Sequence, residues 1–231
     1  MRSASTAAMV LLAHPLFPAQ AAPPPQAAAK TEVAEIRFTL QNPEIHPIRY
    51  SLRIAEDGSG DYRSTAGGAL PSDRGSGLII VPDQSRPIQV GTALRKRLFQ
   101  IARRNRFFGV HCQANSDVAF TGTKTLEYGG PDGQGSCTFT WTKLKDIDEL
   151  TGILQGIACT LDQGGLLTVE HAHTPLALDT GLDDLVQMAQ QGQALELENI
   201  APVLTAIAED EHVIERDQRL ARELLLFDKA D

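Results

Sequence analysis

The stretch Ile48–Ile54, which reads IRYSLRI, constrains the fold more than any other part of this sequence. Apolar and polar side chains alternate strictly along it. Because successive side chains of a β-strand point to opposite faces, the pattern predicts a strand with one buried and one exposed face. The pair Asp57-Gly58 follows directly and supplies the positive φ angles of a tight turn. The chain is therefore expected to return as a hairpin through Tyr62.

The rest of the first half continues this period of two in shorter runs. A first strand is predicted in IRFTL, and a second hairpin in DVAFTGTKTLEY and SCTFTWT, with Cys137, Phe139 and Trp141 on its core side. The segment from Ser64 to Ser85 is rich in Gly, Ser, Pro and Asp, so we expect a long loop there with one short strand in LIIV. Apolar residues spaced by four, seven and eight predict a helix that opens near Thr92.

Beyond Thr142 the apolar spacing changes to three and four, which is typical of helices. One helix is expected to begin near Asp146 and to be interrupted at Gly164-Gly165. Three shorter helices follow, starting near Thr180, at Asn199 to Pro202, and at His212. The predicted fold class is therefore α+β: an antiparallel sheet of four to six strands with a packed helix, followed by a small all-helical C-terminal domain.

The N-terminus predicts export. Residues 1–21 read as a signal peptide, with an apolar run and the small-x-small triplet Ala19-Gln20-Ala21, although a disordered Ala/Pro-rich start is the alternative. No later segment is long and apolar enough to predict a membrane span. We expect an Ala/Pro-rich linker at 22–30, a sheet domain at 31–145 and a helical region at 146–231, in the periplasm or outside the cell.

Charge is distributed unevenly along the chain. Residues 30–141 hold 14 Lys and Arg against 11 Asp and Glu, whereas residues 142–231 hold 6 against 18. The basic residues concentrate in RKRLFQIARRNR at 95–106, where a nucleic-acid interface would start. The acidic net charge of −8 and the helical spacing instead favour a solvated helix face near the acidic C-terminal helices, so no nucleic-acid partner is expected.

The predicted hairpin YSLRIAEDGSGDYRS and the stretch IQVGTALRKRLFQIARRNRFF, which contains the predicted helix, together resemble an uncharacterised family of exported bacterial proteins, a domain of unknown function. The resemblance covers roughly Ile36 to Leu161. Several members carry a cysteine pair before the Tyr-x-Leu-x-Ile strand, where this chain has NPEIHPIRY. Any metal or redox role tied to those cysteines is therefore not implied here. The helical tail is similar to tails of other uncharacterised bacterial proteins and, loosely, to the paired helices of α-solenoid repeats.

The stretch TVEHAHTP raises the question of a metal site, because it places Glu170 beside His171 and His173. Two histidines two residues apart share a face in a strand, but point about 200° apart in a helix. We favour a helical or irregular connection here, so the pair is not expected to chelate a metal ion. An acid/base pair of Glu170 with either histidine is the alternative.

The chain has three cysteines, so at least one is unpaired within it. Cys112 follows the first predicted helix and Cys137 lies on the second strand of the hairpin after it, so the two form a plausible disulfide in an oxidising compartment. Cys159 lies between apolar residues of a predicted helix and reads as a small buried residue.

These observations favour an exported non-catalytic binding or scaffold protein that uses its helical tail to dock another protein or its own sheet domain. No catalytic, cofactor-binding or metal residue is expected. The alternative is a metal-dependent or acid/base hydrolase centred on Glu170, His171 and His173, with His212 as a further candidate. A binding module should expose an apolar patch, whereas the hydrolase requires three ligands that converge on one point.

Overall fold

The computed structural model describes residues 33–67, 69–71, 78–80, 82–114 and 120–227. The predicted signal peptide at 1–21 and the predicted linker at 22–30 lie outside these residues. No helix in the described ranges is long and apolar enough to cross a membrane.

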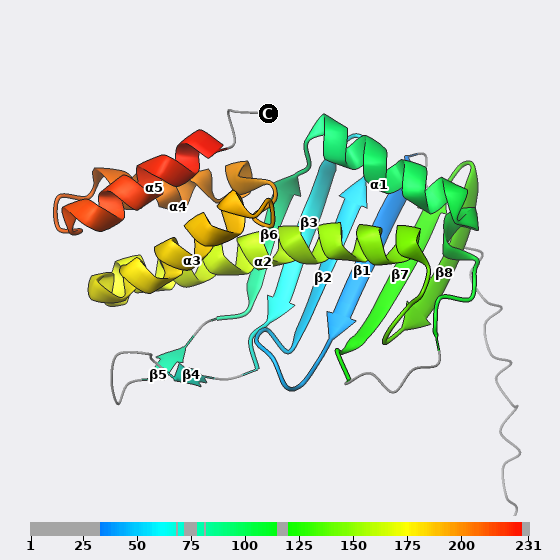
Figure 1. Cartoon of the computed structure of the whole chain (residues 1–231), viewed down its shortest axis with the longest axis horizontal. Helices are drawn as coiled ribbons and strands as arrows, with labels where there is room; N and C mark the ends of the chain where they lie inside the picture. Colours follow the sequence, from blue (N-terminus) through cyan, green and yellow to red (C-terminus); the bar gives the residue numbers. More distant parts are fainter. Residues whose placement is uncertain (1–32, 68, 72–77, 81, 115–119, 228–231) are drawn as a thin grey trace, which may run out of the picture.

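The predicted fold class is confirmed, with six antiparallel strands in the order β6-β3-β2-β1-β7-β8 (Figure 1). The strands of this sheet are β1 Glu35–Gln41, β2 Arg49–Ala55, β3 Ser59–Thr65, β6 Gln84–Gln89, β7 Thr123–Gly130 and β8 Gly133–Phe139. Both predicted hairpins are present. In the first, Gly58 has a φ of 97°, and an Asp57 carboxylate oxygen accepts a hydrogen bond from the Ser59 amide at 2.8 Å.

The alternating pattern places one face of the sheet in the core. Phe38 on β1 lies between Leu52 on β2 and Leu126 on β7, and all three side chains are buried. Side chains at the alternate positions of these strands, such as the paired Arg37 and Arg53, point to the other face. In the last strand Cys137 is buried as predicted, whereas the expected core residue Trp141 is only half-buried and lies beyond the end of β8.

Two helices cover the core face (Figure 1). Helix α1, Thr92–Arg104, starts where predicted and buries Leu98, Phe99, Ile101 and Ala102. Helix α2, Lys145–His173, crosses the strands and continues into the tail. The disulfide predicted between Cys112 and Cys137 is present and joins the segment after α1 to β8. The prediction that Cys159 is buried is wrong, because this residue is exposed on α2.

The predicted interruption at Gly164-Gly165 is wrong, because α2 runs through both residues. A Cβ atom on Gly164 would lie 2.2 Å from Ile200 Cγ2, and one on Gly165 would lie 2.2 Å from Gln84 Nε2. The two glycines therefore permit a close approach of α2 to its neighbours rather than ending the helix.

The predicted long loop from Ser64 to Ser85 holds more strand than expected. Two short strands, β4 Ala69–Pro71 and β5 Leu78–Ile80, pair with each other. The edge strand β6 was not predicted, because its sequence QSRPIQ lacks apolar alternation and contains Pro87. Proline cannot donate a hydrogen bond to a neighbouring strand, but an edge strand tolerates this loss.

The helical tail packs on the second half of α2 and on itself. Helices α3 and α4 both contact α5, and the buried residues of sheet and tail form one hydrophobic cluster. The elements of the tail are η2 Pro175–Ala177, α3 Leu178–Gln190, η3 Leu197–Ile200, α4 Ala201–Glu209 and α5 Glu215–Phe227, and the remaining 3₁₀ turn, η1 Arg106–Phe108, follows α1.

Asn199 in η3 joins the tail to the sheet. Its side chain accepts a hydrogen bond from the Gln89 amide at 2.8 Å and donates one to the Gln89 carbonyl at 2.9 Å.

Candidate functional site: the open face of the sheet

We call the side of the sheet opposite α1 and α2 the open face. Both α1 and α2 lie over the other face (Figure 1), and most side chains of the open face are exposed or half-exposed. A shallow groove of about 410 Å³ crosses it. The groove is lined by residues of four neighbouring strands: Arg37, Thr39, Arg49, Ser51, Leu52, Arg53, Asp61, Arg63 and Glu127.

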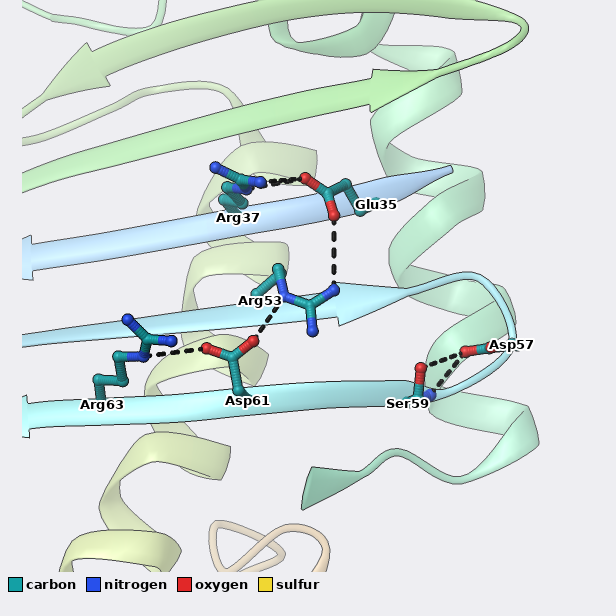
Figure 2. A network of polar contacts seen from close by, with 7 residues as sticks. All are labelled: Glu35, Arg37, Arg53, Asp57, Ser59, Asp61 and Arg63. Atoms are coloured by element: carbon teal, nitrogen blue, oxygen red, sulfur yellow. Dashed lines mark hydrogen bonds and ion pairs between the residues drawn. The ribbon is translucent and has the colours of Figure 1, made fainter. Parts of the chain in front are cut away.

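A chain of ion pairs holds the guanidinium groups of Arg37, Arg53 and Arg63 in place (Figure 2). Arg53 donates from Nε to Asp61 Oδ2 at 2.5 Å, and its Nη1 lies 3.6 Å from Glu35 Oε2. The other oxygen of Glu35 accepts a bond from Arg37 Nε at 2.8 Å, and Asp61 also lies 3.5 Å from Arg63 Nε. The hydrogen bond to Asp61 is the largest of the effects that raise the pKa of Arg53 above its ordinary value.

The groove has more positive than negative side chains although the chain as a whole is acidic. It holds four arginines against Asp61 and Glu127. Arg49 is exposed and forms no ion pair with any described residue. Guanidinium groups bind carboxylates through two parallel hydrogen bonds and keep their protons at neutral pH. The open face is therefore suited to binding anionic groups rather than to moving protons.

The open face is polar, contrary to the apolar patch expected of a binding module. The large exposed apolar side chains of the described residues all lie outside the strands: Val33, Ile45, Phe120, Leu144, Leu176, Ile214 and Leu226. A partner of this face would therefore be recognised mainly through charge and hydrogen bonds.

The structure does not bring the three predicted hydrolase residues together at one point. They occupy the last turns of α2, where Glu170 is buried, His171 is half-buried and His173 is exposed. This helical setting confirms the prediction that the two histidines point in different directions. Among the described residues, no group of three His, Cys, Asp or Glu side chains has the arrangement of a metal site.

His171 instead contacts Asp210, a residue that sequence reasoning missed. His171 Nε2 lies 2.8 Å from Asp210 Oδ2, while His212 Nδ1 lies 3.1 Å from the other oxygen. Hydrogen bonds from the His212 amide and from His171 lower the pKa of Asp210 to about 2. Asp210 follows α4 directly, so these contacts fasten the end of α2 to the tail.

The basic residues of α1 are largely paired with carboxylates. Arg103 makes two hydrogen bonds to Glu56, at 2.6 and 2.9 Å, and one to Asp132 at 2.6 Å. Arg97 pairs with Glu149 at 2.5 Å. The partners come from the turns of the two hairpins and from the start of α2, and the second of these belongs to the acidic helical region at 146–231 that was expected near this helix. These pairs reduce the positive charge available to a nucleic acid.

Comparison with known proteins gave no match to any family model and no significantly similar curated protein.

Proposed function

We propose that this protein is an exported, non-catalytic binding or scaffold protein whose open face recognises an acidic segment of a protein partner. The observation that carries the proposal is the row of four arginines on an uncovered sheet face. The proposed partner is a protein, and no nucleic acid is included, because the basic helix α1 already pairs with the chain's own carboxylates.

The arrangement of the arginines favours a peptide-like ligand. Arg37, Arg49, Arg53 and Arg63 come from three adjacent strands and line one groove, so carboxylates on successive residues of a bound segment could reach several of them. Three are already ordered by Glu35 or Asp61, which reduces the conformational entropy lost on binding. Arg49 is available for a new ion pair with the bound segment. Arg53 and Arg63, which pair with Asp61, would also bind carboxylates of that segment.

Other parts of the chain occupy one end of each edge of the sheet. Next to β8, the Thr140 amide donates to Gln113 Oε1 at 2.8 Å, and the nearby disulfide ties the same segment to the strand. At β6, Asn199 occupies the backbone groups of Gln89. Addition of a partner strand to an edge requires free backbone groups, so the open face is the favoured surface.

Export is part of the proposal. The apolar N-terminal run and the small-x-small triplet predict a signal peptide, and a disulfide is most stable in an oxidising compartment. The predicted resemblance to exported bacterial proteins of unknown function also supports an exported location. The alternative of a hydrolase at Glu170, His171 and His173 is not favoured, because these side chains do not converge.

Binding of a fluorescent polyglutamate peptide, followed by anisotropy, tests the proposal. We compare the wild-type protein with an Arg49→Glu/Arg63→Glu variant and with a control, Lys96→Glu/Arg219→Glu, which changes the net charge equally on exposed helix positions outside the groove. The expected result is saturable binding that weakens at least about tenfold in the open-face variant only. Absence of binding, or equal weakening in both variants, would overturn the proposal.

A further inference from the structure

A second cavity lies on the opposite side of the sheet, between the core face and α2. Its volume is about 110 Å³, and it opens beside the β1–β2 connection. A cavity of about 150 Å³ can hold a benzene molecule, so this one suits a ligand of roughly four or five heavy atoms. Its lining is His46, Pro47, Ser64, Ala66, Asp162, Gln163 and Leu166.

Oxygen acceptors gather around Asp162 at this cavity. The Asp162 carboxylate accepts a hydrogen bond from Gln84 Nε2, at 3.2 Å, and the side chains of Tyr62 and Ser64 lie close enough to interact with it. The side-chain oxygen of Gln163, which lines the cavity, is also buried and has no hydrogen-bond partner among the described residues. Buried acceptors without partners are uncommon in folded proteins, and a ligand that donates several hydrogen bonds would satisfy them.

We propose that this cavity binds the primary ammonium group of a small alkylamine. An ammonium group carries a positive charge and three donors, which match the Asp162 carboxylate and the Gln163 side-chain oxygen. The apolar side of the cavity, formed by Pro47, Ala66 and Leu166, would contact the alkyl chain. This site is independent of the open face, since Ser64 and Asp162 belong to the side of the sheet that α2 covers.

The surroundings of Asp162 make binding depend on pH. Burial raises the pKa of Asp162 to about 6, while Tyr62, Ser64 and the charge of Arg86 lower it in part. Tyr50 and Cys159 also lie near this carboxyl, and desolvation by neighbouring groups together with the charge of Asp162 raises the pKa of each above its ordinary value. His46 is the other titratable group of the lining. An ammonium ion binds the ionised carboxylate, so affinity should rise as the pH increases through about 6.

Calorimetric titration of the full mature chain with n-butylamine tests this proposal, with 1-butanol as the uncharged analogue. Asp162→Asn removes the charge at nearly constant shape, and Asp148→Asn removes a charge from an exposed position on the same helix. His46→Gln shows whether that histidine causes the pH dependence. The expected result is binding of the amine by the wild-type, Asp148→Asn and His46→Gln proteins, at least about tenfold weaker in Asp162→Asn.

The pH dependence provides the second readout. Binding of n-butylamine should weaken several-fold between neutral pH and about pH 5 in the wild-type and His46→Gln proteins, because the carboxyl gains a proton. No binding at neutral pH, equal binding of 1-butanol, or unchanged binding in Asp162→Asn would overturn the proposal. Because none of these variants alters the groove arginines, the result does not depend on the function of the open face.

Discussion

Among single residues, Asp162 should reduce the stability of the protein at neutral pH. Its pKa is about 6 in the folded chain against an ordinary value of 3.8, so the folded state favours the protonated form. The stabilisation that this pKa shift gives the folded state is fully present at pH values below the ordinary pKa of 3.8. It is lost as the pH rises through about 6. Asp162→Asn should therefore raise the free energy of unfolding near neutral pH by at most about 3 kcal/mol, and by much less near pH 4.

Urea unfolding at the two pH values measures this difference. The same destabilisation of the variant at both values would show that the carboxylate contributes hydrogen bonds that asparagine cannot replace. A residue that lowers stability at neutral pH is a candidate for function, which agrees with its place in the proposed amine site.

The glycines of α2 give a matched pair of substitutions. A Cβ atom on Gly152 meets no atom within 4 Å, whereas one on Gly164 would overlap Ile200. Gly152→Ala should raise the free energy of unfolding by about 0.5–1 kcal/mol, because alanine favours the helix. Gly164→Ala should lower it by about 1–3 kcal/mol through overpacking. Thermal and urea unfolding would contradict this account if both variants were stabilised.

At the level of elements, Asn199 links the tail to the edge of the sheet. Asn199→Ala removes both hydrogen bonds to Gln89 and should lower the free energy of unfolding by about 1–3 kcal/mol. Hydrogen exchange at the Gln89 amide should become faster than in a control variant, Gln193→Ala, on an exposed tail residue. Unchanged exchange at Gln89 would show that the tail does not protect this edge.

The elements that sequence reasoning predicted are those with strong local patterns. The strict alternation of IRYSLRI and the Asp57-Gly58 turn predicted the β2–β3 hairpin, and the helical spacing after Thr92 predicted α1. Strand β6 was missed because it owes its place to pairing with β3 rather than to its own pattern. The Gly164-Gly165 error has the same origin, since the partners of these glycines, Gln84 and Ile200, are distant in sequence.

The whole molecule separates its charges in a way that the sequence showed only in part. The sequence shows the excess of basic residues in its first half, and its pattern concentrates that excess in the helix at 95–106. The structure pairs much of that helix with carboxylates and leaves a second basic surface on the sheet. Arg49 and Arg53 were predicted on the exposed side of their strand, yet only the strand order brings Arg37 and Arg63 beside them.

The central claim, that the open face binds an acidic protein segment, is tested most directly by mapping the binding surface. Isotope-labelled protein is titrated with polyglutamate, and NMR shifts of backbone amides and arginine Nε–H groups are followed. We predict that the largest shifts occur on β1, β2 and β3, including the side chains of Arg49, Arg53 and Arg63. Shifts confined to α1 or to the tail helices, with the open face unchanged, would contradict the claim.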